Sequence, residues 1–294
     1  MSFSSDLKSE LTKNRQEKCC DFAELSAMLK FSKRSKNGNI VFSSSYMFIA
    51  ECFSKLLFNC YGVKATIKEA GSKERRYYNS YINSETVRKK IFSQSETLNI
   101  KDLFKRECCL SAFLRGMFLV CGSINDPNKD YHLEFVAKTA DTADLIAEVL
   151  KYNNFSPKIS VRKNNIAVYI KNSDIIEEFL TKTGATQYTL QIIGIRAYKS
   201  MRNKYNRLNN CETANLTKTV NAAVDQINAI KFLEKVGKFS ALPTEILNVA
   251  VLRKENPDAS LSTLCSLSEE DISRSGINHR LQKLVKIAND IKNN

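Results

Sequence analysis

The 294-residue sequence lacks several features that would place it in a common class of protein. No apolar run approaches the roughly 18 residues of a membrane-spanning helix, and the N-terminus shows no apolar segment of a signal peptide. We therefore expect a cytoplasmic protein without a membrane partner. P-loop, GxGxxG and Ser/His/Asp signatures are also missing, which leaves these nucleotide-binding and hydrolase classes without support.

The nine cysteines show neither a CxxC pair nor the spacing of a zinc site. A disulfide framework is not expected in so long a chain without export. We interpret the cysteines as small buried apolar residues of a protein in a reducing compartment, and we expect neither a metal nor a cofactor.

Positive charge is present in excess. Lysine and arginine number 45 against 31 acidic residues, which gives a formal net charge of +14. Such an excess favours a polyanionic partner, nucleic acid before an anionic membrane surface, although a merely soluble basic protein would show it too. The length favours two domains rather than one.

An internal duplication occupies the first 185 residues, with copies at about 1–95 and 105–185. Three matches occur in the same order: Cys19-Cys20-x-x-Ala23-x-Leu25 with Cys108-Cys109-x-x-Ala112-x-Leu114, Lys64–Lys68 with Lys158–Arg162, and Tyr81-Ile82 with Tyr169-Ile170. The periodicity of each copy predicts an α+β unit, and the two units should be related by a pseudo-twofold axis.

The expected elements of the first copy are a helix at about 5–32, strands at about 39–44, 63–68 and 76–82, and helices at about 46–60 and 84–93. Those of the second copy are helices at about 110–121, 139–152 and 173–180, and strands at about 131–136, 156–162 and 166–170.

Residues 186–238 predict a mostly helical connector, with a further helix beginning near residue 209. The apolar stripe of that helix consists of Val220, Ala223, Val224, Ile227 and Ile230, and Gly237 is expected to end it.

Residues 239–294 predict a small all-helical unit. Ser260 is expected to cap a short helix, Leu261–Leu267, and Ser273 a longer helix that ends near residue 291. A short helix, a turn and a longer helix match a helix-turn-helix motif at about 260–291, although an ordinary three-helix bundle with a polar face is the alternative.

The second helix of such a motif enters the major groove of double-stranded DNA. Gly276 is unusual inside it, because glycine costs about 1 kcal/mol there, and close approach to DNA or to the neighbouring helix would explain the residue. The candidate DNA-binding residues are Ser273, Arg274, Ser275, Gly276, Asn278, His279, Arg280, Gln282, Lys283 and Lys286.

Two further groups of basic residues are candidates for phosphate contacts. On the expected strands, Ile67, Ile159 and Val161 take the side opposite to the basic residues. The duplicated basic face could bind a phosphate backbone, or it could be an ordinary solvated sheet surface. The candidates are Lys64, Lys68, Lys158 and Arg162 on the strands, and Arg202, Lys204 and Arg207 in the connector.

The helix that begins each copy has a small residue at an equivalent place, Ala27 in the first and Gly116 in the second. Small residues there allow two helices to approach closely. This pattern resembles the LAGLIDADG family of homing endonucleases, which implies a duplicated αββαββα domain with two central helices. In that family an acid near the end of each central helix binds the divalent metal that drives DNA cleavage.

The sequence departs from that family at these acids. By the resemblance they fall on Ser32 and Cys121, and neither residue is a carboxylate ligand for magnesium. We therefore expect a LAGLIDADG-like domain without catalytic residues or a metal.

The chain as a whole resembles the WhiA family of bacterial sporulation regulators and cell-division proteins. The most specific matches are Asn206-Arg207-x-x-Asn210-Cys211-Glu212-Thr213-Ala214-Asn215 and Ser273-x-Ser275-Gly276-x-Asn278-His279-Arg280-Leu281; the others include Phe113-Leu114-Arg115-Gly116, Gly122-Ser123-x-x-Asp126-Pro127 and Tyr131–Phe135. One departure is Lys33-Arg34 at the end of the first central helix, where such proteins commonly have Gly-Ser.

The resemblance implies a LAGLIDADG-like domain followed by an all-α helix-turn-helix domain, DNA binding, and roles in cell division, chromosome segregation and transcription regulation. The leading hypothesis is a non-enzymatic DNA-binding regulator associated with the nucleoid. The alternatives are a magnesium-dependent site-specific endonuclease and an adaptor protein of the division machinery with incidental DNA affinity. Other regulatory or division proteins are possible partners, and the oligomeric state is open.

Overall fold

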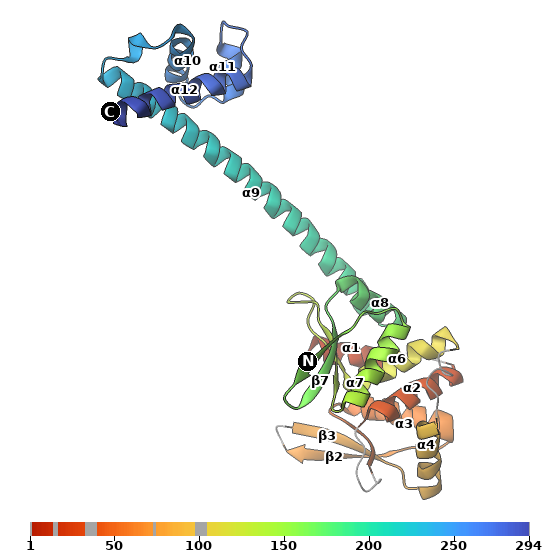
Figure 1. Ribbon diagram of the computed structural model, residues 1–294. Coiled ribbons are helices and arrows are strands. Elements are labelled where there is room, and N and C mark those ends of the chain that lie inside the picture. Colours follow the sequence, from red (N-terminus) through yellow and green to blue (C-terminus); the bar gives the residue numbers. More distant parts are fainter. Residues whose placement is uncertain (1, 14–16, 33–39, 73–74, 98–104, 294) are drawn as a thin grey trace. The chain divides into compact units, whose positions relative to one another are not determined.

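The computed structural model of the chain describes residues 2–13, 17–32, 40–72, 75–97 and 105–293. These residues form two compact units, Met1–Lys199 and Ser200–Asn294. The N-terminal unit is α+β and the C-terminal unit is all-α, as the sequence predicts (Figure 1). None of the helices in the described ranges has both the length and the apolar character needed to span a bilayer.

The first copy begins with two helices rather than the single helix expected at 5–32. Ser2 accepts from the backbone N–H of Ser5 and starts α1 with a capping box, and a second helix starts after Glu17. The elements of this copy are α1 (Phe3–Leu11), α2 (Lys18–Phe31), β1 (Ile40–Ser44), α3 (Met47–Tyr61), β2 (Thr66–Ser72), β3 (Arg75–Tyr81) and α4 (Glu85–Thr97). Lys33-Arg34, where the sequence departs from the family's common Gly-Ser, lies outside the described residues.

The second copy repeats the order from α2 onward, with the additional strand β4 after its first helix. Its elements are α6 (Glu107–Cys121), β4 (Gly122–Ile124), β5 (Leu133–Ala137), α7 (Ala140–Tyr152), β6 (Lys158–Arg162), β7 (Asn165–Ile170) and α8 (Ser173–Thr183). The short strand β4 was not expected from the sequence, because three residues are too few to show an alternating pattern. The order α6, β4, β5, α7, β6, β7, α8 is the predicted αββαββα arrangement.

Both sheets are antiparallel, and they share one topology over three strands, to which β4 adds a fourth in the second sheet. The strand order is β1-β3-β2 in the first sheet and β4-β5-β7-β6 in the second. The two hairpins differ by two residues in register, because Thr66 pairs with Tyr81 whereas Lys158 pairs with Tyr169. The sequence match of Lys64 with Lys158 is therefore two residues out of register, although a shift of two keeps each side chain on the same face.

Strand β6 has the alternation expected from the sequence. Ile159 and Val161 alternate with Lys158 and Arg162, which places them on the opposite face of the strand. Both faces are open to solvent, since Val161 is 80% exposed and Ile159 is 49% exposed. Strand β6 lies at the edge of its sheet.

The helices α2 and α6 lie side by side at the centre of the N-terminal unit (Figure 1). A Cβ atom on Gly116 would lie 2.5 Å from the backbone oxygen of Glu24 and 2.9 Å from the Cβ of Ala27. This confirms that the small residues allow the close approach of the two helices. Both helices contribute to one core that extends through both copies and includes Leu25, Met28, Phe53, Phe113, Phe118, Phe135 and Phe179.

A buried ion pair joins the same two helices. The Nε of Arg115 lies 2.9 Å from a carboxylate oxygen of Glu24, and its Nη1 donates to the backbone oxygen of Thr183 at 2.9 Å. Both side chains of the pair are almost completely buried. This contact links the two copies across 91 residues of sequence, and the sequence reading did not anticipate it.

Residues 186–235 form one 50-residue helix, α9 (Thr186–Lys235), instead of two. Its only glycine is Gly194 and it has no proline, so the backbone has nothing to interrupt it. Ile192 belongs to the N-terminal core, and Ala229, Ile230 and Leu233 belong to the C-terminal core. The expected stripe is buried only toward its end, since Val220 and Val224 are each 51% exposed.

The C-terminal unit consists of α9 from Ser200 onward, a short 3-10 turn (Phe239–Ala241), α10 (Thr244–Glu255), α11 (Leu261–Leu267) and α12 (Arg274–Asn293). Gly237 has a left-handed φ of 69°, which ends α9 as predicted. Buried Arg253 donates from Nη1 to the backbone oxygen of Ala259 at 2.6 Å and so fixes the loop between α10 and α11.

Candidate nucleic-acid interface

Helix α12 has one buried face and one exposed face. Ile277, Leu281, Leu284 and Ala288 are buried against α10, α11 and the end of α9. Their spacing of three and four residues leaves the polar side chains between them on the outside of the helix. The exposed candidates are Ser273, Arg274, Ser275, His279, Gln282, Lys283 and Lys286, and Asn278 is partly exposed.

The start of α12 is fixed by a serine cap. The hydroxyl of Ser273 accepts from the backbone N–H of Gly276 at 3.2 Å and lies 3.0 Å from the hydroxyl of Ser275. The preceding helix α11 is capped in the same way, by the hydroxyl of Ser260 on the N–H of Thr263. Both caps agree with the sequence prediction and set the ends of the turn between the two helices.

Gly276 is crowded by a side chain of the preceding turn. A Cβ there would lie 2.8 Å from Cγ1 of Ile272, in the turn that precedes α12. The expectation of close approach to the neighbouring helix is therefore wrong, because the crowding group is a side chain of the turn.

Arg280 has acidic partners within the C-terminal unit. Its Nη1 lies 2.5 Å from a carboxylate oxygen of Glu270, and its Nη2 lies 3.8 Å from Glu245 of α10. Hydrogen bonds from Arg280 and Asn248 lower the pKa of Glu270 below its usual range. The arginine therefore ties the turn to α12 and α10, a role that the sequence did not reveal because its partners lie on other elements.

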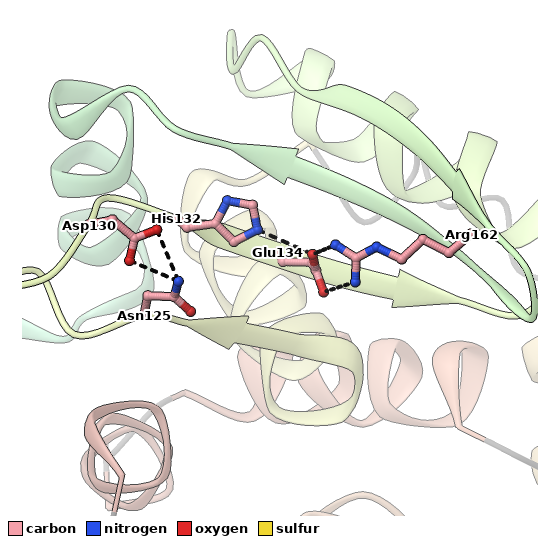
Figure 2. Close-up of polar contacts among 5 residues, drawn as sticks. All are labelled: Asn125, Asp130, His132, Glu134 and Arg162. Atoms are coloured by element: carbon pink, nitrogen blue, oxygen red, sulfur yellow. Dashed lines mark hydrogen bonds and ion pairs between the residues drawn. The ribbon is translucent and has the colours of Figure 1, made fainter.

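On the second sheet, the candidate Arg162 also has an acidic partner. Figure 2 shows His132 and Arg162 both directed at Glu134 of β5. Arg162 binds the two carboxylate oxygens of Glu134 at 3.2 and 2.5 Å, and the Nε2 of His132 lies 3.2 Å away. Burial alone would raise the pKa of Glu134, but these hydrogen bonds outweigh it and hold the pKa below its usual range.

The neighbouring turn has its own contact: Asn125 donates to both carboxylate oxygens of Asp130 at 2.9 and 3.2 Å (Figure 2). His132 stacks on Tyr169 with 5.4 Å between ring centroids, so its imidazole has both an aromatic and an acidic neighbour.

The remaining basic candidates are exposed. Lys68 and Lys158 lie on strands, Lys64 lies just before β2, and the ammonium groups of Lys64 and Lys68 contact the rings of Phe58 and Tyr81. Arg202, Lys204 and Arg207 lie on a stretch of α9 whose residues are all exposed.

The ends of α2 and α6 are where the LAGLIDADG resemblance places metal-binding acids. The thiol of Cys121 donates to the backbone oxygen of Met117, and burial raises its pKa to about 12, so it is uncharged near neutral pH. Buried Lys8 donates to the backbone oxygen of Leu119 at 3.2 Å. The hydroxyl of Ser32 donates to the backbone oxygen of Leu29. A lysine, a neutral thiol and a hydroxyl are not ligands that favour a hard divalent cation.

At the opposite ends of the same helices, four cysteines converge. The sulfur atoms of Cys19, Cys20, Cys108 and Cys109 all lie within 4.8 Å of one another. Cys108 is exposed, as is Cys211 elsewhere in the chain, so the interpretation of all cysteines as buried apolar residues is wrong. The spacing of the cysteines along the sequence does not reveal this cluster. Each pair is adjacent in sequence rather than in a CxxC motif, and the two pairs come from different copies.

Family models and individual relatives both match this chain to the same family. A model of the WhiA LAGLIDADG-like domain matches residues 110–202, and a model of the WhiA C-terminal HTH domain matches residues 205–288. The "Probable cell division protein WhiA" of Caldicellulosiruptor bescii is 37% identical and covers 99% of this chain and 96% of that protein. The protein of the same name from Clostridium botulinum is 36% identical and covers 99% of both.

Two solved structures have the same fold. The crystal structure of full-length DUF199/WhiA from Thermatoga maritima superposes with a TM-score of 0.62 at 24% identity and covers 99% of each chain. The N-terminal LAGLIDADG domain of DUF199/WhiA gives a TM-score of 0.50 at 22% identity, over 62% of this chain and 92% of that one. The chain thus has an N-terminal LAGLIDADG domain and a C-terminal helix-turn-helix domain.

Proposed function

Since the chain belongs to the WhiA family, we propose that it is a non-enzymatic regulator of bacterial cell division that binds double-stranded DNA. The observation that carries this proposal is the exposed polar face of α12. Six candidate side chains on α12 and that of Ser273, which caps it, are exposed, and four buried apolar residues hold the helix in place. A helix presented in this way fits the major groove.

The exposed face offers the chemistry that reads DNA. Asn278 and Gln282 match the hydrogen-bonding edge of adenine, and Lys283 and Lys286 match guanine or phosphate. Ser273 and Ser275, at the start of α12, are suited to a phosphate oxygen. Arg280 acts as a positioning residue in this proposal, because Glu270 and Glu245 hold it within the unit.

The N-terminal unit would add contacts that do not depend on sequence. Lys64, Lys68 and Lys158 are exposed, as are the α9 candidates Arg202, Lys204 and Arg207. Arg162 would contribute less, since its guanidinium is already paired with Glu134. The same surface is also available for a regulatory or division protein.

The absence of catalysis in this proposal rests on the chemistry at the ends of α2 and α6. Phosphodiester cleavage by divalent metals needs carboxylates that hold the ions. Lys8 brings a buried cationic group to the end of α6, where Cys121 supplies an uncharged thiol. In the cell we expect the protein to be associated with the nucleoid, with chromosome segregation and transcription regulation among its roles.

The test is DNA binding by the full chain on genomic fragments at two salt concentrations with magnesium present. We expect a sequence preference and no cut product. Replacing three exposed residues of α12, His279→Ala, Gln282→Ala and Lys283→Ala, should lower the affinity for preferred fragments at least about 10-fold, since each base contact contributes about 1–3 kcal/mol.

Lys292→Ala is the matched control, because Lys292 is exposed on the last turn of the same helix. It should leave the sequence preference unchanged. Cleavage in magnesium would instead establish an endonuclease. Binding without preference that is lost at the higher salt would favour the adaptor protein.

A further inference from the structure

The four cysteines at the start of α2 and α6 form a set of soft ligands that the proposed function does not use. Cys19 and Cys20 come from the first copy, and Cys108 and Cys109 come from the second. In a tetrahedral tetrathiolate site the metal–sulfur bonds are about 2.3 Å, so the sulfur atoms lie about 3.8 Å apart. The observed sulfurs, all within 4.8 Å of one another, are close to that arrangement.

Two helix N-termini and one guanidinium lie next to the four thiols. Lys18 is the first residue of α2 and Glu107 the first of α6, so each cysteine pair occupies the second and third positions of a helix. The positive end of a helix dipole stabilises a thiolate. Arg106, which precedes α6, interacts with Cys19. These two helix ends and the guanidinium offset part of the negative charge that metal binding would create.

The inner side of the cluster is apolar and buried. Cys20 and Cys109 are buried with Ala23 and Ala112, one helical turn further on, while Cys108 is exposed. Two ligands are therefore fixed by packing, and an ion can enter from the exposed side. A structural metal site needs this combination of preset ligands and an entry path.

We propose that these four thiols bind one Zn²⁺ ion as a tetrathiolate. The balanced reaction is the displacement of one proton from each of four Cys–SH groups by Zn²⁺, which gives a Zn(S–Cys)₄ centre of charge −2 and releases four protons. All nine cysteines are free thiols in the structure, so no oxidant is needed. Adjacent thiols this close to one another suit a single ion better than an iron–sulfur cluster, whose several metal ions would hold the ligands further apart.

Such a site would cross-link the two copies. It would hold α2 and α6 together at their N-terminal ends, whereas the family's metal-binding acids would lie at the C-terminal ends, near Ser32 and Cys121. The ion would thus have a structural role in the central helix pair, and this inference does not depend on the DNA-binding proposal.

The test uses the full chain expressed with zinc and purified under reducing conditions without chelator. Elemental analysis should find about one zinc per chain. Replacing zinc by Co²⁺ should give sulfur-to-cobalt charge-transfer bands and the intense visible bands of a tetrahedral tetrathiolate. This measurement on the unmodified chain does not depend on whether any variant folds.

The diagnostic variant is Cys19→Ser with Cys108→Ser, which spares the buried pair. Its zinc content should fall at least about 10-fold. The matched control, Cys211→Ser with Cys265→Ser, removes two thiols from the C-terminal unit and should retain the metal.

Three outcomes would overturn the proposal. The first is a folded wild-type chain without stoichiometric metal, and the second is a cobalt spectrum without thiolate bands. The third is equal zinc content in the diagnostic and control variants.

Discussion

The N-terminal unit buries charged side chains between its central elements, whereas in the C-terminal unit the outer face of α12 presents its basic side chains to solvent. Glu24 and Arg115 form a buried pair, and Lys8 is buried against the end of α6. On α12, by contrast, Arg274, Lys283 and Lys286 are exposed. Substitutions in the first unit should therefore change stability, while those in the second should change binding.

This difference matches the parts that the two units play in the proposed function. Buried charge is tolerated only with partners, so it fixes the arrangement of the elements that supply them. Exposed charge costs the fold little and remains available to a polyanion.

The largest effect that would test this comparison is expected at Arg115. Arg115→Leu leaves the carboxylate of Glu24 buried without its cation, which should lower the free energy of unfolding of the N-terminal unit by about 3–5 kcal/mol. Chemical denaturation measures the change. Lys283→Ala, on the exposed face of α12, should change stability by no more than about 0.5 kcal/mol.

The double variant Glu24→Met with Arg115→Leu is the control for Arg115. Removing both charges should recover most of the loss, because an apolar pair has no desolvation penalty. Equal stability of Arg115→Leu and the wild type would show that the pair does not hold α2 to α6.

A pH effect of intermediate size is expected at Lys8. Burial lowers the pKa of this lysine from 10.5 to about 8. Between these two pH values the native state binds fewer protons than the unfolded state, so the stability of the N-terminal unit should rise with pH across this window. The full rise is on the order of 3 kcal/mol.

Lys8→Met provides the reference, because it removes the titrating group. At pH 7 the free energy of unfolding should be higher for the variant than for the wild type. By pH 10 this advantage of the variant should have become smaller. A difference that stays constant with pH would show that Lys8 is not desolvated in the native state.

The smallest effect distinguishes two glycines, one in each unit. In Gly116→Ala the new Cβ meets the backbone oxygen of Glu24 at 2.5 Å, and this should cost about 1–3 kcal/mol. In Gly276→Ala the nearest group is the Ile272 side chain, which can rotate, and alanine is favoured in a helix by about 1 kcal/mol. Its net effect should stay within about 1 kcal/mol.

Thermal unfolding of the two alanine variants measures the contrast. If Gly276→Ala proved as destabilising as Gly116→Ala, the turn before α12 would be as rigid as the central helix pair, and the comparison between the units would fail at that point.

The sequence by itself determined the local elements and their order. Hydrophobic periodicity, serine caps and the repeated Cys-Cys motif predicted most helices and strands, the duplication and the helix-turn-helix motif. These signals are local: a helix stripe or a cap depends on residues three or four positions apart. For the same reason the exposed face of α12 was predictable, since the buried stripe of the helix defines it.

Only the tertiary structure decided which distant side chains meet. It paired Arg115 with Glu24 and Arg280 with Glu270, and it brought the cysteines of the two copies within 4.8 Å of one another. It also showed α9 as one helix of 50 residues. The approach of groups about 90 residues apart depends on how the copies pack, and the spacing of residues along one strand or helix contains no measure of that packing.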